Sequence, residues 1–324
     1  GRAAASGGDR RRPARTLSVV PLAAVIGAAT AVGVGAERRF GEGAERLARR
    51  LMQVVLWALV PVIVFVQVTD LRLTARVGAG IGFAYAGLAL ALALAYVVGT
   101  FALRLERPSV GALMNVSALG NTGYLGLPFA VAVLGFDALP SAVAYDALVS
   151  GVALVTVGFS VGAAFGTVAE RPRDRARAFF TRNPPLWATA AGLLAPPALA
   201  PDWAASASQV LVVLILPLGF FAVGVILAAE AEEGALRFPP PLDAPVAWAV
   251  ALKLLVPPAV VLGLSRALVD VPEAYLTQAA MASAINTIVV AHAYGLDRRL
   301  TAAAIAWSTA LVVVAGLVAA VVGA

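Results

Sequence analysis

Ten blocks of mostly apolar residues follow one another along the chain, each bounded by charged residues or by glycine and proline. A helix of about 20 residues crosses the ~30 Å hydrocarbon core of a bilayer, and most of the blocks have that length. Their apolar runs are continuous, whereas a strand facing lipid would alternate apolar and polar residues. The pattern therefore predicts ten transmembrane helices, at 17–36, 48–69, 77–103, 109–135, 140–166, 184–200, 204–229, 244–268, 273–294 and 300–323.

Composition supports this all-α polytopic membrane fold. Hydrophobic residues make up 61% of the 324 residues and charged residues 13%, against roughly 25% charged residues in soluble domains. This excludes a soluble globular enzyme, a disordered chain and a nucleic-acid binder, because so much apolar surface cannot be hidden in one water-soluble core. The absence of cysteine excludes disulfides and Cys-ligated metal, and a single histidine excludes a His-rich metal site. No cofactor or metal is expected.

Short matches between the halves predict an internal repeat. Pro61, followed four residues later by a phenylalanine in the second span, corresponds to Pro217 in the seventh span, and the pair Asn121-Thr122 corresponds to Asn286-Thr287. Both separations are roughly 160 residues, about five spans. Five is odd, so the second half would enter the membrane from the opposite side, as in many secondary transporters. The predicted organisation is a basic tail 1–16, a first repeat 17–166, a basic linker 167–183 and a second repeat 184–324.

The distribution of arginine predicts orientation. Fifteen arginines follow spans one, three, five, seven and nine, and three lie in the opposite loops. Loops rich in Lys and Arg stay in the cytoplasm, so the arginine-rich loops are predicted to be cytoplasmic. Both termini would then lie outside, although five further arginines in the N-terminal tail oppose this orientation. The chain is predicted to be a multi-pass protein of the cell membrane.

The fourth span combines helix breakers with polar side chains. Its breakers are Gly120, Gly123, Gly126 and Pro128, and its polar residues include Asn115, Asn121 and Thr122. Proline removes a backbone hydrogen bond, and non-helical backbone at membrane depth is tolerated where it lines a cavity. We therefore predict a broken helix whose amides and hydroxyls line a binding site. The structural alternative is a kinked helix whose asparagines bond to neighbouring helices.

The ninth span repeats the amide pair without a nearby proline. Ser283, Asn286 and Thr287 supply its polar groups, and we predict that it contributes to the same substrate site. Its break is less strongly indicated than that of the fourth span. Hydrogen bonds between helices are the alternative role for these residues.

Three ionisable residues fall inside predicted spans, where charge is costly and function is the default hypothesis. Asp146 is a candidate proton carrier. Lys253 could neutralise a substrate carboxylate or pair with an acid, and His292 titrates near neutral pH when unperturbed. Each has a structural alternative, namely an interfacial carboxylate, a snorkelling or ion-paired lysine, and a solvated or core-bonded ring.

The segment Asn121 to Pro128, NTGYLGLP, resembles the signature of the auxin efflux carrier family of membrane transporters. Weaker matches are Asn183-Pro184-Pro185, Lys253 with Pro257, and the stretch 294–297, YGLD. The resemblance implies ten helices in two inverted repeats, with spans four and nine broken where they cross near the substrate. It further implies a scaffold domain, a transport domain, a possible homodimer and the export or exchange of small organic anions. Where the family commonly has a proline in span nine, this chain has Ala282-Ser283-Ala284.

Together these observations predict a secondary transporter of small organic anions, such as auxin-like weak acids or malonate-type carboxylates, with protons as a candidate coupling ion. No GxxxxGK[ST] motif for binding ATP is present. A sodium-coupled symporter of the bile-acid type is the main alternative. An intramembrane enzyme would need a catalytic constellation that the chain lacks, so the chain is predicted not to be an enzyme, and channel-like flux would indicate a channel.

Overall fold

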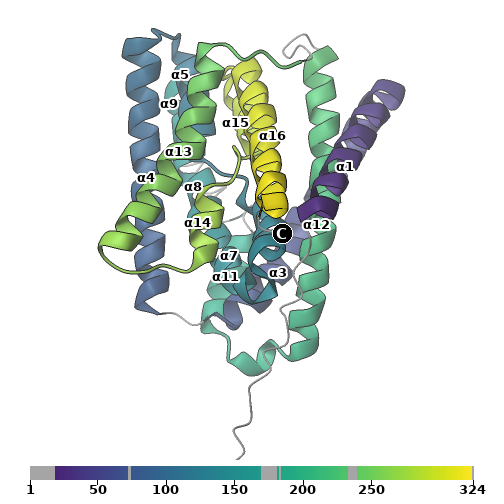
Figure 1. Cartoon of the computed structure of the whole chain (residues 1–324). Coiled ribbons are helices and arrows are strands. Elements are labelled where there is room, and N and C mark those ends of the chain that lie inside the picture. Colours follow the sequence, from purple (N-terminus) through teal and green to yellow (C-terminus); the bar gives the residue numbers. More distant parts are fainter. Residues whose placement is uncertain (1–18, 72–73, 169–180, 182–183, 233–238, 323–324) are drawn as a thin grey trace, which may run out of the picture.

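The computed structural model describes residues 19–71, 74–168, 181, 184–232 and 239–322, and these are almost entirely helical (Figure 1). The predicted tail 1–16 and most of the predicted linker 167–183 lie outside the described residues. The named elements are α1 (Val19–Phe40), α2 (Glu42–Val54), η1 (Val55–Leu59), α3 (Val60–Thr69), α4 (Ala75–Val97), η2 (Val98–Ala102), α5 (Arg107–Ala118), η3 (Thr122–Gly126), α6 (Leu127–Leu134), η4 (Phe136–Ala138), α7 (Leu139–Tyr145), η5 (Asp146–Ser150), α8 (Gly151–Ala153), η6 (Leu154–Gly158), α9 (Phe159–Phe165), α11 (Pro184–Leu194), η7 (Pro197–Leu199), α12 (Asp202–Glu232), α13 (Ala244–Ala267), α14 (Glu273–Ala279), α15 (Asn286–Tyr294) and α16 (Arg298–Val322).

Among the described residues, seven helices are long and apolar enough to cross a membrane. Several of them join α-helical and π-helical segments without interruption, and the seven are Val20–Phe40, Glu42–Thr69, Ala75–Ala102, Phe136–Phe165, Asp202–Glu232, Ala244–Ala267 and Arg298–Ala319. They confirm the all-α polytopic membrane fold. The other three predicted spans are not single long helices, because 109–135 and 273–294 are interrupted and 184–200 is divided into the 11-residue α11 and the short η7.

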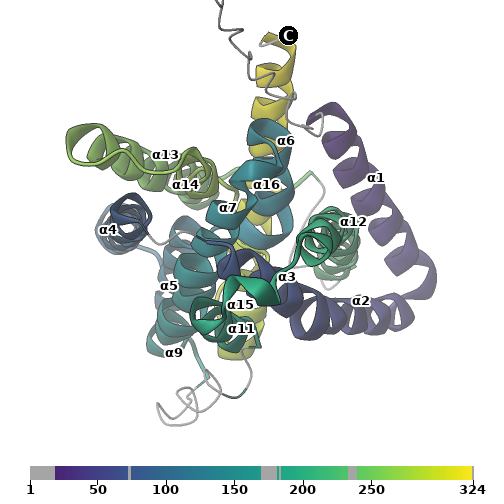
Figure 2. The ribbon, with the colours of Figure 1, turned by 90° about the horizontal axis from the view of Figure 1, so that it is seen from below.

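The long helices pack in pairs that define two groups (Figures 1 and 2). In one, α1 packs along α12 and α3 packs along α11, with α2 against α12; we call these helices with η1 the α1–α12 group. In the other, α4 packs along α13; α5, α14 and α16 pack against this pair, and α9 and α15 pack against α5; we call this the crossover group. A shift of five spans exchanges the pair α1–α12 with the pair α11–α3. This pairing is what two five-span repeats require, although the repeat itself stays a prediction.

Small residues allow the closest of these contacts. A Cβ on Gly33 of α1 would lie 2.2 Å from the carbonyl oxygen of Phe221 in α12, and a Cβ on Gly224 would lie 2.2 Å from that of Thr30. A side chain at either position would collide with backbone, so the α1–α12 crossing depends on both glycines. Small residues serve the same purpose in other membrane proteins, because they let helix backbones approach.

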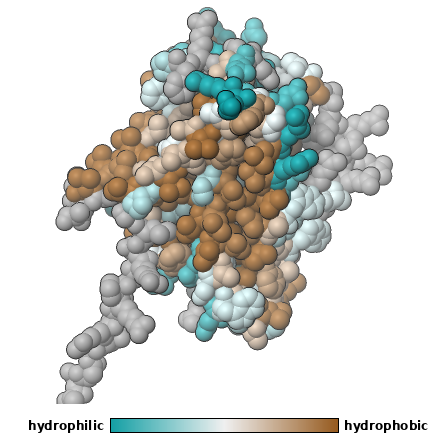
Figure 3. Space-filling view, turned by 90° about the vertical axis from the view of Figure 1, so that its right-hand side faces the viewer, coloured by the Kyte–Doolittle hydropathy of each residue, from teal (hydrophilic) through white to brown (hydrophobic). Residues whose placement is uncertain are grey.

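Polar contacts gather at one end of the molecule. There Arg107 bonds to the carbonyl of Ala164 at 2.7 Å, Ser109 bonds to Asp297 at 2.8 Å, and Arg299 pairs with Asp243 at 2.7 Å. These contacts join the starts of α5, α13 and α16 to the ends of α9 and α15. We call this the arginine-rich end. The face seen in Figure 3 is hydrophobic over its middle, and its hydrophilic residues collect mainly toward the top.

Candidate functional site

The two interrupted spans cross at their breaks. Between α5 and η3, and between α14 and α15, the chain is extended enough for Gly120 and Ser283 to form an antiparallel bridge. The amide of Asn121 donates to the carbonyl of Ala282 at 2.7 Å, and the amide of Ala284 donates to the carbonyl of Leu119 at 2.9 Å. Each break therefore supplies hydrogen-bond partners that the other has lost, which satisfies backbone groups that lipid could not.

The second break forms although no proline or glycine lies within it. Ser283 holds it in place, because its hydroxyl donates to the carbonyl of Val116 in α5 at 2.8 Å and its amide donates to the hydroxyl of Ser308 in α16 at 3.0 Å. The predicted break in span nine is thus present, and tertiary hydrogen bonds compensate for the lost helix bonds.

A cavity of about 1030 Å³ leads from this crossover to the arginine-rich end. One wall comes from α2, η1 and α12, and the facing wall comes from η3, η5, η6 and α15. The cavity therefore lies between the α1–α12 group and the segments that meet at the crossover. Its inner end is polar, and its walls are mostly apolar, with side chains such as Leu56, Ile215, Ile226, Leu154 and Ile288.

The predicted substrate-binding residues divide into two sets. Asn121, Thr122 and Asn286 line the large cavity. The other three do not line it and form internal bonds instead. Asn115 donates to the carbonyl of Gly158 at 3.2 Å, Thr287 donates to that of Ala284 at 2.6 Å, and Ser283 makes the bonds given above. For these three, the sequence could not distinguish a polar group facing the cavity from one bonded inside the helix packing.

The predicted hinge residues have different roles in the first break. Gly120 lies at the bridge, between the large cavity and a small one. Gly126 is needed for packing, because a Cβ there would lie 2.0 Å from Oε1 of Gln278. Pro128 lies at the start of α6, where the π-helical segment η3 passes into the α-helix. Gly123 faces Asp146, whose two carboxylate oxygens lie 3.4 Å from the position of an added Cβ.

Asp146 lies at the inner end of the large cavity. It is the first residue of the π-helical segment η5, and its carboxylate accepts a hydrogen bond from the hydroxyl of Thr122. Thr122 is itself the first residue of η3. Single π-helical turns occur often at functional sites. Here two such turns, η3 and η5, place the Asp146 carboxylate at the crossover.

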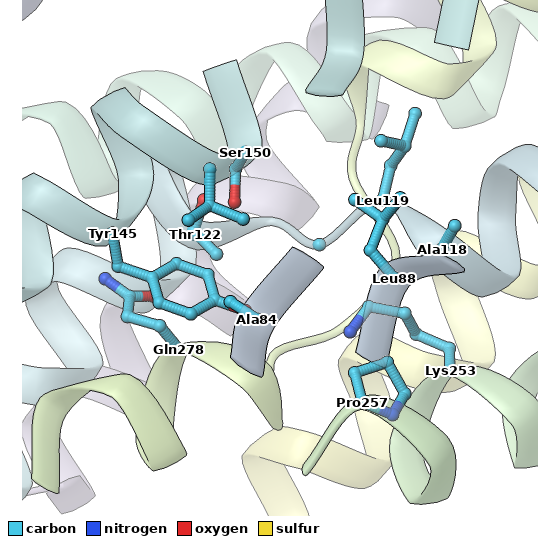
Figure 4. Close-up of a pocket in the computed structure, with 12 residues that line it drawn as sticks. Ala84, Leu88, Ala118, Leu119, Thr122, Tyr145, Ser150, Lys253, Pro257 and Gln278 are labelled. Carbon is cyan, nitrogen blue, oxygen red and sulfur yellow. The ribbon is translucent and has the colours of Figure 1, made fainter. Parts of the chain in front are cut away.

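Lys253 lies on the other side of the crossover, outside the large cavity. It is 1% exposed, and its ammonium donates to the carbonyl of Ala279 at the end of α14 at 3.1 Å. A cation suits a helix C-terminus, where the carbonyls carry partial negative charge. Lys253 lines a small cavity of about 10 Å³ together with Leu88, Thr122 and Gln278. In Figure 4, Lys253 and Pro257 lie apart from Thr122, Ser150, Tyr145 and Gln278.

His292 lies at the opposite end of the large cavity from the crossover. Its ring contacts the carboxylate of Glu230 at 2.5 Å, and Arg298 approaches that carboxylate at 3.8 Å. The Glu230 side chain is 3% exposed, whereas the His292 side chain is 47% exposed. The contact joins α12 of one helix group to α15 of the other, where the cavity reaches the arginine-rich end.

Three residues of this region were not singled out from the sequence. Glu230 falls just beyond the predicted seventh span. Tyr124 packs its ring against α12, where a Cβ on Gly219 would lie 2.8 Å from the ring. Gln278 is fully buried and donates to the carbonyl of Ala142 at 3.2 Å. A buried glutamine within a span was a usable signal, but the tyrosine had none beyond its place in the motif.

The chemistry available at the inner end of the cavity suits an anion. Helices Thr122–Leu134 and Asn286–Tyr294 both begin there, and helix N-termini carry partial positive charge. The side-chain nitrogen Nδ2 of Asn121 is buried without a hydrogen-bond partner among the described residues. The part of the chain that the structure describes contains no group of three or more His, Cys, Asp or Glu residues able to hold a metal ion.

Part of the chain is similar in sequence to known membrane transporters. Residues 181–319 match the family model described as membrane transport protein, which is the model of the auxin efflux carrier family. A protein of Methanocaldococcus jannaschii described as an uncharacterized transporter is 40% identical over 73 residues. That match covers 22% of this chain and 23% of the relative. The family match falls on the second half of the chain, which contains the second break, Lys253 and His292.

Proposed function

We propose that this chain, whose residues 181–319 match the family model described as membrane transport protein, is a secondary active transporter of small organic anions that works by alternating access. The observation that carries this proposal is the large cavity ending at the two crossed breaks. Such crossed breaks, with half-helices pointing at a substrate, are a recurring design of secondary transporters.

The cavity also suggests the shape of the substrate. A carboxylate placed at the inner end would lie near the side-chain amides of Asn121 and Asn286 and near the starts of two helices. The rest of the molecule would contact the apolar walls. Ligand sites commonly combine a few polar groups with apolar walls in this way. The proposed substrate is therefore a small organic acid, either an auxin-like weak acid or a malonate-type carboxylate.

Access from one side supports the proposed cycle. The large cavity joins the crossover to the arginine-rich end, while the α4–α13 side of the crossover contains the cavity of only about 10 Å³. In this state the substrate would enter from the arginine-rich end. Movement of the crossover group against the α1–α12 group would close that path and open another.

Exchange in proteoliposomes tests the proposal. Vesicles loaded with unlabelled indole-3-acetate or malonate would take up the labelled acid, first under a pH gradient and then under a sodium gradient. A hydrogen bond to a charged group contributes about 1.5–3 kcal/mol. Asn121→Ala and Asn286→Ala should therefore each lower kcat/KM by about tenfold or more.

Asn115→Ala is the matched control, because Asn115 belongs to the same span and does not line the large cavity. Its KM should remain close to that of the wild type. Full activity of both cavity variants would contradict the proposed site. A strict need for sodium would favour the alternative, a sodium-coupled symporter of the bile-acid type, and flux at channel rates would exclude a carrier.

Several features of the assembled protein stay predictions. They are the repeat boundaries 17–166 and 184–324, a location in the cell membrane with the arginine-rich end in the cytoplasm, and the formation of a homodimer. Protons are the predicted coupling ion.

A further inference from the structure

The carboxylate of Asp146, a residue of η5, lies beside the start of the helix Thr122–Leu134, which follows the first break. Its carboxylate accepts from the Thr122 hydroxyl, and both of its oxygens lie beside Gly123, at 3.4 Å from an added Cβ. Thr122 and Gly123 are the first two residues of the helix Thr122–Leu134. The protein's own carboxylate therefore sits where the partial positive charge of that helix is strongest.

A second polar group near this helix start, the side chain of Asn121, lacks one of its hydrogen-bond partners. Asn121, which precedes the helix, is 3% exposed and lines the large cavity. Its side-chain oxygen accepts from the backbone amide of Leu125, while its side-chain nitrogen Nδ2 has no hydrogen-bond partner among the described residues. A buried amide without an acceptor is costly, so a ligand carboxylate bound beside Asn121 would supply the acceptor that this donor lacks.

The second half-helix provides the contrast. Asn286 begins α15 and lines the same cavity, and no described acidic side chain is bonded to the start of that helix. A substrate carboxylate at the crossover would thus lie near the start of α15, which has no bonded acidic side chain, and near the start of Thr122–Leu134, which is next to Asp146. Two carboxylates that share a site cannot both stay ionised at low cost, and one of them holds a proton.

The ionisable groups around Asp146 do not neutralise it. Tyr124 faces it from η3, and the hydroxyl of Tyr85 in α4 donates to the carbonyl of Leu148 at 2.6 Å. Helix α11 brings no ionisable side chain. Lys253, across the crossover, bonds to Ala279, and no described cation forms a salt bridge with Asp146.

We propose that a substrate carboxylate binds at the crossover only when Asp146 carries a proton, so that one proton travels with each substrate in the same direction. This inference rests on the proposed function. Asp146 takes the proton from water in the large cavity as the anion enters, and it returns the proton to water on the other side after the change of access. For a monoanion the complex then moves without net charge.

Counting protons during binding tests this directly. Purified protein in detergent would be titrated with indole-3-acetate and with malonate by calorimetry, in buffers that differ in protonation enthalpy. The wild type should take up about one proton per acid bound at a pH where Asp146 is ionised. Its apparent Kd should then rise about tenfold for each pH unit. Asp146→Asn should bind either acid with no proton uptake and little pH dependence.

Asp137→Asn is the matched control, since Asp137 is exposed, begins the same long helix and does not line the cavity. It should keep the proton uptake of the wild type. Binding by the wild type without proton uptake would overturn the inference and leave the proposed function standing, even if Asp146→Asn fails to fold. Proton uptake that persists in Asp146→Asn would also overturn it. If neither acid binds to the wild type, both proposals fail.

Discussion

The two breaks perform the same structural task with different residues. The first contains Gly120, Gly123 and Gly126, and its helix begins at the N-cap Asn121, whose side chain accepts from Leu125. The second contains only alanine, methionine, serine and isoleucine between α14 and α15, and its helix begins without a side-chain cap. The first break is therefore encoded locally, whereas the second depends on its partners.

Those partners are identifiable. In the second break, the amide of Ser283 donates to the hydroxyl of Ser308. The neighbouring backbone groups of this break are hydrogen-bonded to Leu119 and Asn121 of the first. Helix propensity alone would favour continuing α14 through its alanines. A helix break can thus be imposed by neighbouring groups once they supply the lost hydrogen bonds, and this comparison can be tested by weakening each break separately.

The largest effect is expected from Gly126→Ala in the first break. The new Cβ would lie 2.0 Å from Oε1 of Gln278 and 3.0 Å from Cγ of Met281. Gln278 is buried and bonded to Ala142, so it cannot move away freely. Overpacking of this kind costs about 1–3 kcal/mol, and we expect the upper part of that range in thermal unfolding followed by tryptophan fluorescence.

Gly123→Ala is the control for this prediction. Its Cβ would meet Asp146 at 3.4 Å, which is an ordinary contact. It should therefore lower the unfolding temperature less than Gly126→Ala does. Equal losses would show that the first break requires glycine for backbone freedom throughout and not for packing at one position.

A smaller effect is expected from Ser308→Ala, which acts on the second break. The variant removes the acceptor of the buried Ser283 amide, and an unsatisfied buried donor costs about 1–3 kcal/mol. Amide exchange at Ser283, measured by mass spectrometry, should become faster. Ser283→Ala keeps that backbone bond and loses only the bond to Val116, so exchange at this amide should change less.

The smallest effect is expected from replacing the two asparagines Asn121 and Asn286, whose variants should lose different amounts of stability. Asn121→Ala removes a helix N-cap, at a cost of about 1 kcal/mol. The side chain of Asn286 forms no hydrogen bond within the described residues, so Asn286→Ala should lower the free energy of unfolding by less than about 0.5 kcal/mol. Unfolding of both variants in detergent would compare them. A larger loss for Asn286→Ala would contradict the assignment of a capping role to the first break alone.

Much of the architecture followed from the order of apolar and polar residues. Long apolar runs must become helices in lipid, because only local hydrogen bonds satisfy the backbone there. Ten spans were predicted on this ground, of which seven are long helices among the described residues. The interruption in the fourth span was predicted as well, and the motif at Asn121–Pro128 pointed to the transporter family. Glycine, proline and asparagine act locally, so their effect can be predicted from neighbouring residues alone.

Other features depended on contacts between residues far apart in the chain. The break in the ninth span relies on Ser308 and on the first break, which no local pattern reveals. Tertiary packing also placed Lys253 against the end of α14, joined Glu230 to His292, and turned Asn115 and Ser283 away from the cavity while Asn121 and Asn286 face it. The sequence determined which segments are helices and which polar groups lie at membrane depth, and the tertiary structure decided which of those groups bond to one another and which remain available to a ligand.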